Sequence, residues 1–208
     1  MKNKLGVVLG GLFIAFQTAA FSATTLTVSA TIPAATGISL TVTPVNSNTG
    51  VWGTSSTSAT TLPFGTLTYN SANGIYLPSS SFAIDIGSAG GAGTPTVAVT
   101  YIEGTNPNGS SVNGGLGTKT TATFATEANS GTTITETLSA LGKKRLIDLT
   151  GTAGELTSVP AGSWERIYVG IWTGSTVAPA DPSNGKPFSN TDVPGTYTGS
   201  LTFTAVSL

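Results

Sequence analysis

Apolar and polar residues alternate along much of this chain, and this period of two is the feature that most limits its fold. The clearest case is near the C-terminus, where Tyr197, Leu201 and Phe203 take one set of alternate positions and threonines and serines take the other. Such alternation is typical of strands that bury one face of a sheet. No segment has a convincing apolar repeat of 3.6 residues, the pattern of an amphipathic helix. The sequence therefore predicts an all-β protein.

About ten such segments follow one another at short spacings, with Gly, Pro and Asn turns between them. Strands are expected at residues 24–32, 38–42, 62–69, 82–86, 96–102, 120–126, 132–139, 143–149, 164–172 and 195–206. The pattern favours an antiparallel, immunoglobulin-like β-sandwich that forms a single domain over residues 38–208. Residues 164–172 are the most apolar of these segments and carry large side chains at both sets of positions, so they are expected at the centre of a sheet.

Residues 1–22 have the pattern of a cleaved signal peptide. Lys2 and Lys4 precede the apolar run 5–16, and small residues occupy the two positions that a signal peptidase recognises. The run is short for a membrane span, although a retained anchor is the alternative. We therefore expect a secreted mature chain that begins at Ala23 and does not insert into a membrane.

The composition leaves few routes to catalysis. The chain has no Cys and no His, so the usual thiol nucleophile, the usual general base and most transition-metal ligands are missing. Its nine acidic residues are scattered singly, and its net charge of −1 argues against nucleic-acid binding. We predict no enzyme activity, no cofactor and no metal. Residues 181–186 loosely suggest calcium ligands, but an ordinary surface turn is favoured and the question stays open.

The three tryptophans raise the question of sugar binding. Trp164 and Trp172 lie in the most apolar segment, where core packing is the better interpretation. Trp52 is the one large apolar residue of a long polar loop, so it is the candidate ligand contact. The basic run 143–145 is interpreted as a solvated strand end rather than a binding patch.

The first segment of the mature chain has a separate character. In residues 24–32, Leu26, Val28, Ala30 and Ile32 fall on one face, and threonines and a serine fall on the other. Residues 33–37 follow as a hinge that contains Pro33 and Gly37. The alternation predicts a half-buried strand, but it leaves open whether that strand completes its own sheet or a neighbour's.

Three segments carry a family resemblance. They are the alternating strand behind the signal peptide, Leu62-Pro63-Phe64-Gly65-Thr66-Leu67, and the closing Val193-Pro194-Gly195-Thr196-Tyr197-Thr198-Gly199-Ser200-Leu201-Thr202-Phe203-Thr204. Together they resemble the pilins that periplasmic chaperones and outer-membrane ushers assemble, including the spore-coat-U-like and cysteine-free fimbrial groups. The resemblance implies a sandwich that lacks one strand and whose groove accepts the N-terminal extension of the next subunit.

On this resemblance, residues 23–37 are a donor-strand extension with its hinge, and Leu26, Val28, Ala30 and Ile32 are the subunit-interface residues. The implied partners are copies of the chain or related subunits, a periplasmic chaperone and an outer-membrane usher. The expected function is that of a structural subunit of a surface fimbria, which passes through the periplasm to the cell surface. The alternative is a self-contained secreted β-sandwich that binds carbohydrate or cell wall.

Overall fold

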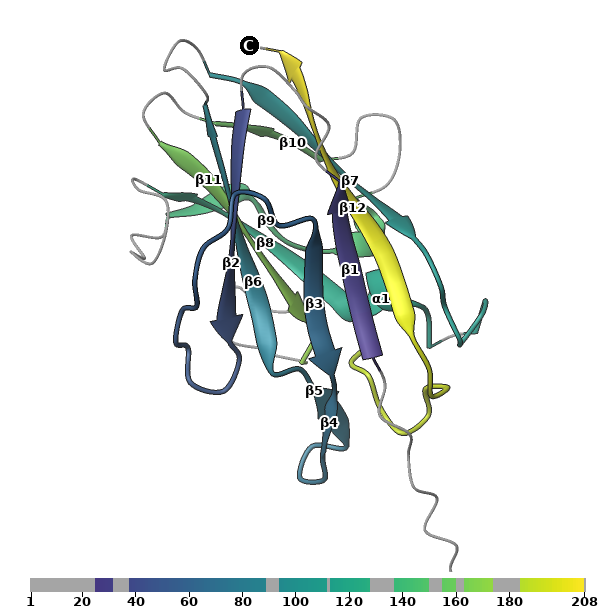
Figure 1. The fold of residues 1–208 in the computed structure, drawn as a ribbon. Coiled ribbons are helices and arrows are strands. Elements are labelled where there is room, and N and C mark those ends of the chain that lie inside the picture. The colour runs from purple at the N-terminus through teal and green to yellow at the C-terminus, as the bar shows by residue number, and fades with distance from the viewer. Residues whose placement is uncertain are drawn as a thin grey trace, which may run out of the picture.

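Two facing β-sheets make up most of this computed structural model (Figure 1). It describes residues 25–31, 38–88, 94–111, 113–127, 137–149, 155–159, 163–173 and 184–207. The strands alternate with turns, and the helices are short: α1 (Leu116–Lys119) and the 3₁₀ helix η1 (Leu146–Asp148). The prediction of an all-β sandwich built mainly from antiparallel strands is confirmed. The signal peptide predicted for residues 1–22 lies outside the described residues.

The first sheet, sheet A, has the strand order β10-β7-β12-β1-β3. Its strands are β1 (Thr25–Thr31), β3 (Thr61–Thr66), β7 (Thr96–Glu103), β10 (Glu155–Ser158) and β12 (Tyr197–Ser207). The pairs are antiparallel except β1 with β12, which run parallel. Within sheet A, the first strand of the described residues, β1, thus lies beside the last, β12.

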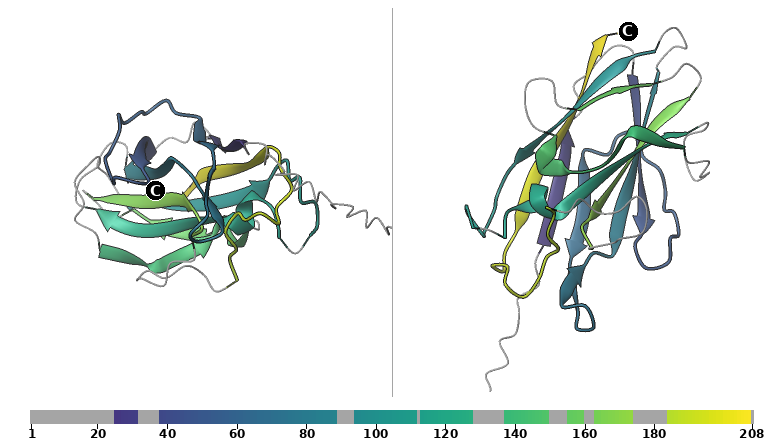
Figure 2. Two further views of the ribbon diagram at one scale, coloured as in Figure 1. Left: turned by 90° about the horizontal axis from the view of Figure 1, so that it is seen from below. Right: turned by 180° about the vertical axis from the view of Figure 1, so that it is seen from behind.

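The second sheet, sheet B, has the order β2-β6-β11-β8-β9, and all its pairs are antiparallel. Its strands are β2 (Ile38–Asn46), β6 (Ser80–Ser88), β8 (Thr120–Glu127), β9 (Thr137–Arg145) and β11 (Trp164–Ile171). The apolar segment around residues 164–172 is therefore central, as predicted. A small hairpin, β4 (Thr68–Asn70) with β5 (Ile75–Leu77), extends beyond the end of the sandwich opposite the C-terminus, as Figure 2 also shows.

The core lies between the two sheets and follows the alternation of the sequence. On β12, Tyr197, Leu201 and Phe203 are fully buried, whereas the alternate residues Thr198, Ser200 and Thr202 are only partly buried. Sheet B contributes Ile167 and Val169 from β11 in the same way. Because the chain has no cysteine, this apolar layer and the strand pairing are what stabilise the fold.

Strand β2 is longer than predicted. The sequence predicted an end before Pro44, but β2 continues through Pro44 to Asn46. Val42 and Asn46 donate their N–H groups outward, to Ser56 and Val51, so alternate residues of β2 hydrogen-bond away from β6. Pro44 shares that outward side, where a missing N–H costs no bond to β6.

Two other predictions about strand limits are wrong. Residues 62–69 form two strands, β3 and β4, rather than one. Residues 143–149 do not form a strand of their own, since 143–145 complete β9 and Leu146 begins η1. The helical turn has a clear reason: Leu146 and Leu149 are both fully buried, and a strand would point them to opposite faces. The predicted hairpin between β8 and β9 does form, with β9 described from Thr137; residues 132–136 of the predicted strand lie outside the described residues.

Candidate functional site

Strand β1 occupies a slot between two strands that are otherwise separate. It pairs in parallel with β12 on one side and antiparallel with β3 on the other, and Figure 1 shows it between them. Among the described residues, β12 and β3 share no backbone pairing, so β1 joins β3 to the rest of sheet A. The N-terminal segment that the sequence singled out is thus an interior strand in this chain.

The register places the predicted apolar positions of β1 beside the core-facing residues of β12. Leu26 is paired with Tyr197, and Ala30 is paired with Leu201. Tyr197 and Leu201 are both 0% exposed. Val28, between them, is paired with a glycine of β12. Ile32, the fourth predicted interface residue, lies outside the described residues.

The opposite wall of the slot is β3. Val28 is paired with Leu62, which is fully buried, as is Phe64 in the same strand. Leu26 is paired with Gly65, whose φ of +74° is in the left-handed region that glycine adopts without strain. The register shifts just after Leu26, so the Phe64-Gly65 element coincides with an irregularity in the pairing.

This geometry gives the slot a defined chemistry. It offers two rows of backbone N–H and C=O groups, from β12 and β3, and an apolar floor that includes Leu62, Phe64, Tyr197 and Leu201. A site of this kind binds an extended peptide through its main chain and selects alternate apolar side chains.

Trp52 lies on sheet B and is half-buried. It bridges to Val45 of β2, and its ring meets that of Tyr168 edge-on, with centroids 6.3 Å apart. The guanidinium carbon of Arg166 lies 5.0 Å from the centroid of the Trp52 ring. Trp52 therefore has packing partners within the chain, and its role as a ligand contact stays a prediction.

Beneath Trp52 is a buried ionic cluster that sequence reasoning missed. Arg166 is 0% exposed and donates from Nε and Nη2 to the two carboxylate oxygens of Asp85, at 2.5 and 3.1 Å. Its Nη1 lies 3.5 Å from Oε1 of Glu127. Asp85 is the register partner of Arg166 across β6 and β11, so the alternation of two strands brings the pair together. We interpret this cluster as structural, because its charges are paired and covered.

Glu165 is a buried acid on the core side of β11. It is 1% exposed, and Thr126 donates a hydrogen bond to its Oε2 at 3.4 Å. Burial raises the pKa of Glu165 to about 7, an effect that the hydroxyl groups of Thr157 and Thr126 partly offset. No second carboxylate is hydrogen-bonded to it within the described ranges. Nor do three or more potential metal ligands gather anywhere in those ranges.

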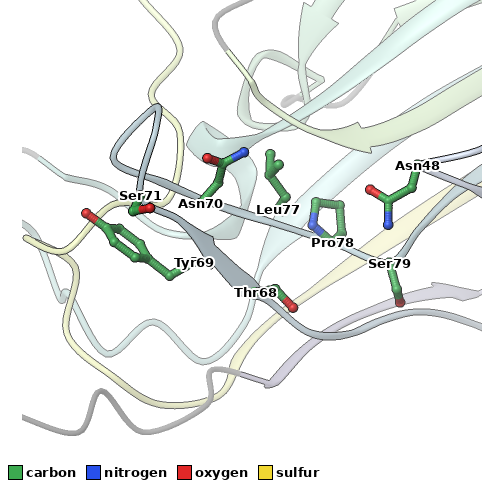
Figure 3. A pocket seen from close by; sticks show the side chains of 8 residues that line it. All are labelled: Asn48, Thr68, Tyr69, Asn70, Ser71, Leu77, Pro78 and Ser79. Atoms are coloured by element: carbon green, nitrogen blue, oxygen red, sulfur yellow. The ribbon is translucent and has the colours of Figure 1, made fainter.

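Among the described residues, the exposed aromatic side chain that lines a pocket is Tyr69 rather than a tryptophan. It is 44% exposed and lines a pocket of about 390 Å³ at the β4–β5 hairpin (Figure 3). The other lining residues are uncharged as well: Asn48, Thr68, Asn70, Ser71, Leu77, Pro78 and Ser79. An aromatic ring beside amides and hydroxyls suits a neutral, hydroxyl-rich ligand.

Comparison with known proteins gives no family for this chain, so its function has to be inferred from the sites described above. No family model, curated protein or solved structure matches the chain. Within the described residues, no helix has the length and apolar character needed to cross a membrane. The slot filled by β1 is the feature with the most specific geometry.

Proposed function

We propose that this protein is a structural subunit of a surface fimbria or filament and that it polymerises by donor-strand exchange through its N-terminal strand. The observation that carries the proposal is the place of β1 as the strand that joins β12 to β3. In the assembled filament, β1 of one subunit lies in the slot of the next.

The connection of β1 to the body favours such an exchange. Six residues, 32–37, separate β1 from β2, which belongs to the opposite sheet. A strand that is attached at one end and paired along both sides can be replaced by the same segment of a neighbour, because the pairing partners are identical. A head-to-tail exchange of this kind propagates into a filament when the subunits do not close into a ring.

The energetic contribution of the strand is substantial. Under this proposal the donated strand places large aliphatic side chains in the slot, and fully burying one such side chain stabilises a protein by roughly 1.5–3 kcal/mol. The main-chain hydrogen bonds to β12 and β3 add to this on both sides of the strand. An exchanged strand would therefore hold two subunits together without a disulfide, in keeping with the absence of cysteine.

The proposal also specifies partners and location. A subunit whose slot is empty exposes two strand edges and an apolar floor, which invites aggregation. A periplasmic chaperone that covers the slot and an outer-membrane usher that releases the subunit meet this need. The mature chain is then exported through the periplasm and displayed outside the cell, assembled with copies of itself or related subunits.

The test compares two forms of the mature protein by size-exclusion chromatography with light scattering. The first begins at Ala23 and the second at Ile38, so that the second lacks β1. We expect the first to polymerise, or to need a chaperone for solubility, and the second to be a monomer that binds a peptide of residues 24–32. A stable Ala23 monomer that unfolds when it is shortened would show that β1 serves its own chain, and the proposal would fail.

Two variants of the peptide of residues 24–32 test whether its binding to the shortened protein is specific. Val28→Asp places a charge at the position paired with the buried Leu62, and we expect it to abolish binding. Thr27→Asp places the same charge at the neighbouring position, paired with the half-exposed Thr198 and the exposed Pro63. Binding of the second peptide but not the first would support insertion in the register of β1.

One observation favours a second function, a neutral-saccharide binding module. The Tyr69 pocket is uncharged and combines an exposed ring with the amides of Asn48 and Asn70. If this function holds, neutral oligosaccharides will perturb the nuclear magnetic resonance signals of these residues, and Tyr69→Ala will remove the effect. Val51→Ala, at an exposed apolar residue that does not line this pocket, is the control. Unperturbed signals across a panel of neutral oligosaccharides would eliminate the idea.

A further inference from the structure

Three polar side chains, two from neighbouring segments and one from much later in the chain, meet at one end of the sandwich. Lys119 ends α1, Asn108 lies in the turn that follows β7, and Asp192 lies in the segment before β12. All three are buried: Lys119 is 1% exposed, Asn108 is 9% exposed, and the Asp192 side chain is 6% exposed. None belongs to the β1 slot or to the Tyr69 pocket.

Asp192 connects the other two through a single oxygen atom. Its Oδ1 lies 2.8 Å from Nζ of Lys119 and accepts a hydrogen bond from Nδ2 of Asn108 at 2.7 Å. Its Oδ2 accepts from Nζ at 3.0 Å and from the backbone N–H of Ser189 at 2.7 Å. The carboxylate is therefore fixed between an amine and a carboxamide, in contact with both nitrogens.

The Lys119 amine is desolvated, and desolvation is the condition that favours loss of its proton. Nζ lies 4.9 Å from the centroid of the Phe188 ring, and the neighbouring Pro187 carbonyl accepts a hydrogen bond from it at 3.1 Å. Burial lowers the pKa of Lys119, although the Asp192 carboxylate opposes this effect. A desolvated lysine of this kind gives up a proton to a neighbouring base more readily than one in water, and its neutral form is a nucleophile.

Asn108 is held as an electrophile would be. Its carbonyl oxygen accepts a hydrogen bond from the backbone N–H of Val193 at 2.8 Å, which would stabilise negative charge developing on that oxygen. Its Nδ2 donates to the carbonyl of Gly114 at 2.7 Å as well as to Asp192. Both ends of the carboxamide are thus fixed, and the nitrogen lies against a group that can supply a proton.

We propose that Lys119 and Asn108 form an intramolecular isopeptide bond, with Asp192 as the proton-transfer group. Asp192 takes a proton from the ammonium group, and Nζ attacks Cγ of Asn108. The Nζ–Cγ bond forms and the Cγ–Nδ2 bond breaks, with the negative charge of the tetrahedral intermediate beside the Val193 N–H. Two protons pass from Nζ to Nδ2, which leaves as ammonium. No oxidant, cofactor or other reactant is needed.

The cross-link would act where the fold depends on irregular segments. It would fix the turn carrying Asn108 to the start of β8 and close a short loop, which restricts the unfolded chain. Asp192 would remain hydrogen-bonded beside it and hold the segment that leads into β12. A chain without cysteine would in this way gain a covalent constraint that is insensitive to reduction.

The first test is the intact mass of the folded, mature protein under denaturing conditions. We expect it to be lower than the sequence mass by one ammonia molecule, and proteolysis with tandem mass spectrometry to give a branched peptide that joins Lys119 to Asn108. The full sequence mass in folded protein would overturn the proposal. Loss of one water, with a Lys119–Asp192 link, would overturn Asn108 as the acceptor.

Variants separate this chemistry from a change in folding. We expect Asn108→Ala and Asp192→Ala to restore the mass calculated from their own sequences. Asn113→Ala is the matched control: its Nδ2 donates to the Thr191 carbonyl nearby, at 2.8 Å, rather than to Asp192, so the ammonia loss should persist. Circular dichroism establishes that each variant is folded. Persistence of the mass loss in Asn108→Ala would also refute the proposal.

Discussion

Replacing Glu165 with glutamine should change how the stability of the protein depends on pH. Glu165 is almost fully buried, and its pKa is raised from 4.5 to about 7, chiefly by burial. In the unfolded chain, the carboxyl group titrates near its ordinary value. Between these two values, the folded protein holds a proton that the unfolded chain releases.

The sign and size of the effect follow from this difference. Because the folded state binds the proton more tightly, the free energy of unfolding falls as the pH rises from about 4.5 to about 7, and then levels off. Each unit of pKa difference corresponds to about 1.4 kcal/mol, so Glu165 alone should cost about 3 kcal/mol of stability at pH 8 relative to pH 4. Glutamine has nearly the same shape and does not ionise, so this cost should be absent.

Urea unfolding followed by tryptophan fluorescence measures the effect, because Trp164 is adjacent in the chain. The Glu165→Gln variant should match the wild type near pH 4 and exceed it by about 3 kcal/mol near pH 8, as the pKa difference requires. The comparison isolates one group, since the other carboxylates titrate alike in both proteins. If the two curves run parallel from pH 4 to pH 8, Glu165 is not a desolvated acid and the reasoning is wrong.

Two further predictions concern a surface ion pair and a close backbone approach. The Arg145 guanidinium lowers the pKa of Asp148, so Asp148→Asn should lower the free energy of unfolding by less than about 1 kcal/mol at pH 7. This difference should vanish as the pH falls through the Asp148 pKa. Urea unfolding at several pH values measures it, and a difference that grew in acid would refute the prediction. A Cβ at Gly199 would lie 2.5 Å from Cε2 of Tyr101, so Gly199→Ala should lower the free energy of unfolding by about 1–3 kcal/mol. Gly170→Ala, whose Cβ would make only an ordinary contact at 3.6 Å, should lower it less in the same urea assay. Equal effects of the two substitutions would contradict the clash at Gly199.

Sequence patterns predicted the strands that bury one face and expose the other. Tyr197, Leu201 and Phe203 repeat every second residue or at a multiple of two, so β12 was predicted near its observed limits. The short strands β5 and β10 were missed, because three or four residues give too little alternation to recognise. A limit was wrong where an irregularity interrupts the alternation: the pattern breaks near Gly142, whose φ is +63°, but β9 continues through it with a shift in its pairing to β8.

In the candidate sites as well, the sequence predicted local structure but not which distant segments lie side by side. Alternation alone identified residues 24–32 as a strand, but it carries no information about which strands lie beside it, so the pairing with β12 and β3 came from the structure. Asn108, Lys119 and Asp192 stood out in no pattern. They meet because turns at the end of the sandwich bring separate segments together, and no spacing along the chain encodes that contact.

The pairing of β1 with β12 also sets the order in which the molecule can fold. β1 covers Thr25–Thr31 and β12 covers Tyr197–Ser207, so β1 is synthesised long before its partner. Contacts between residues so far apart in sequence have a large loop-closure cost and slow folding. Sheet A therefore completes its pairing late, only after β12 has been made, and until β1 has paired with both neighbours the edges of β3 and β12 are the most exposed to unwanted association.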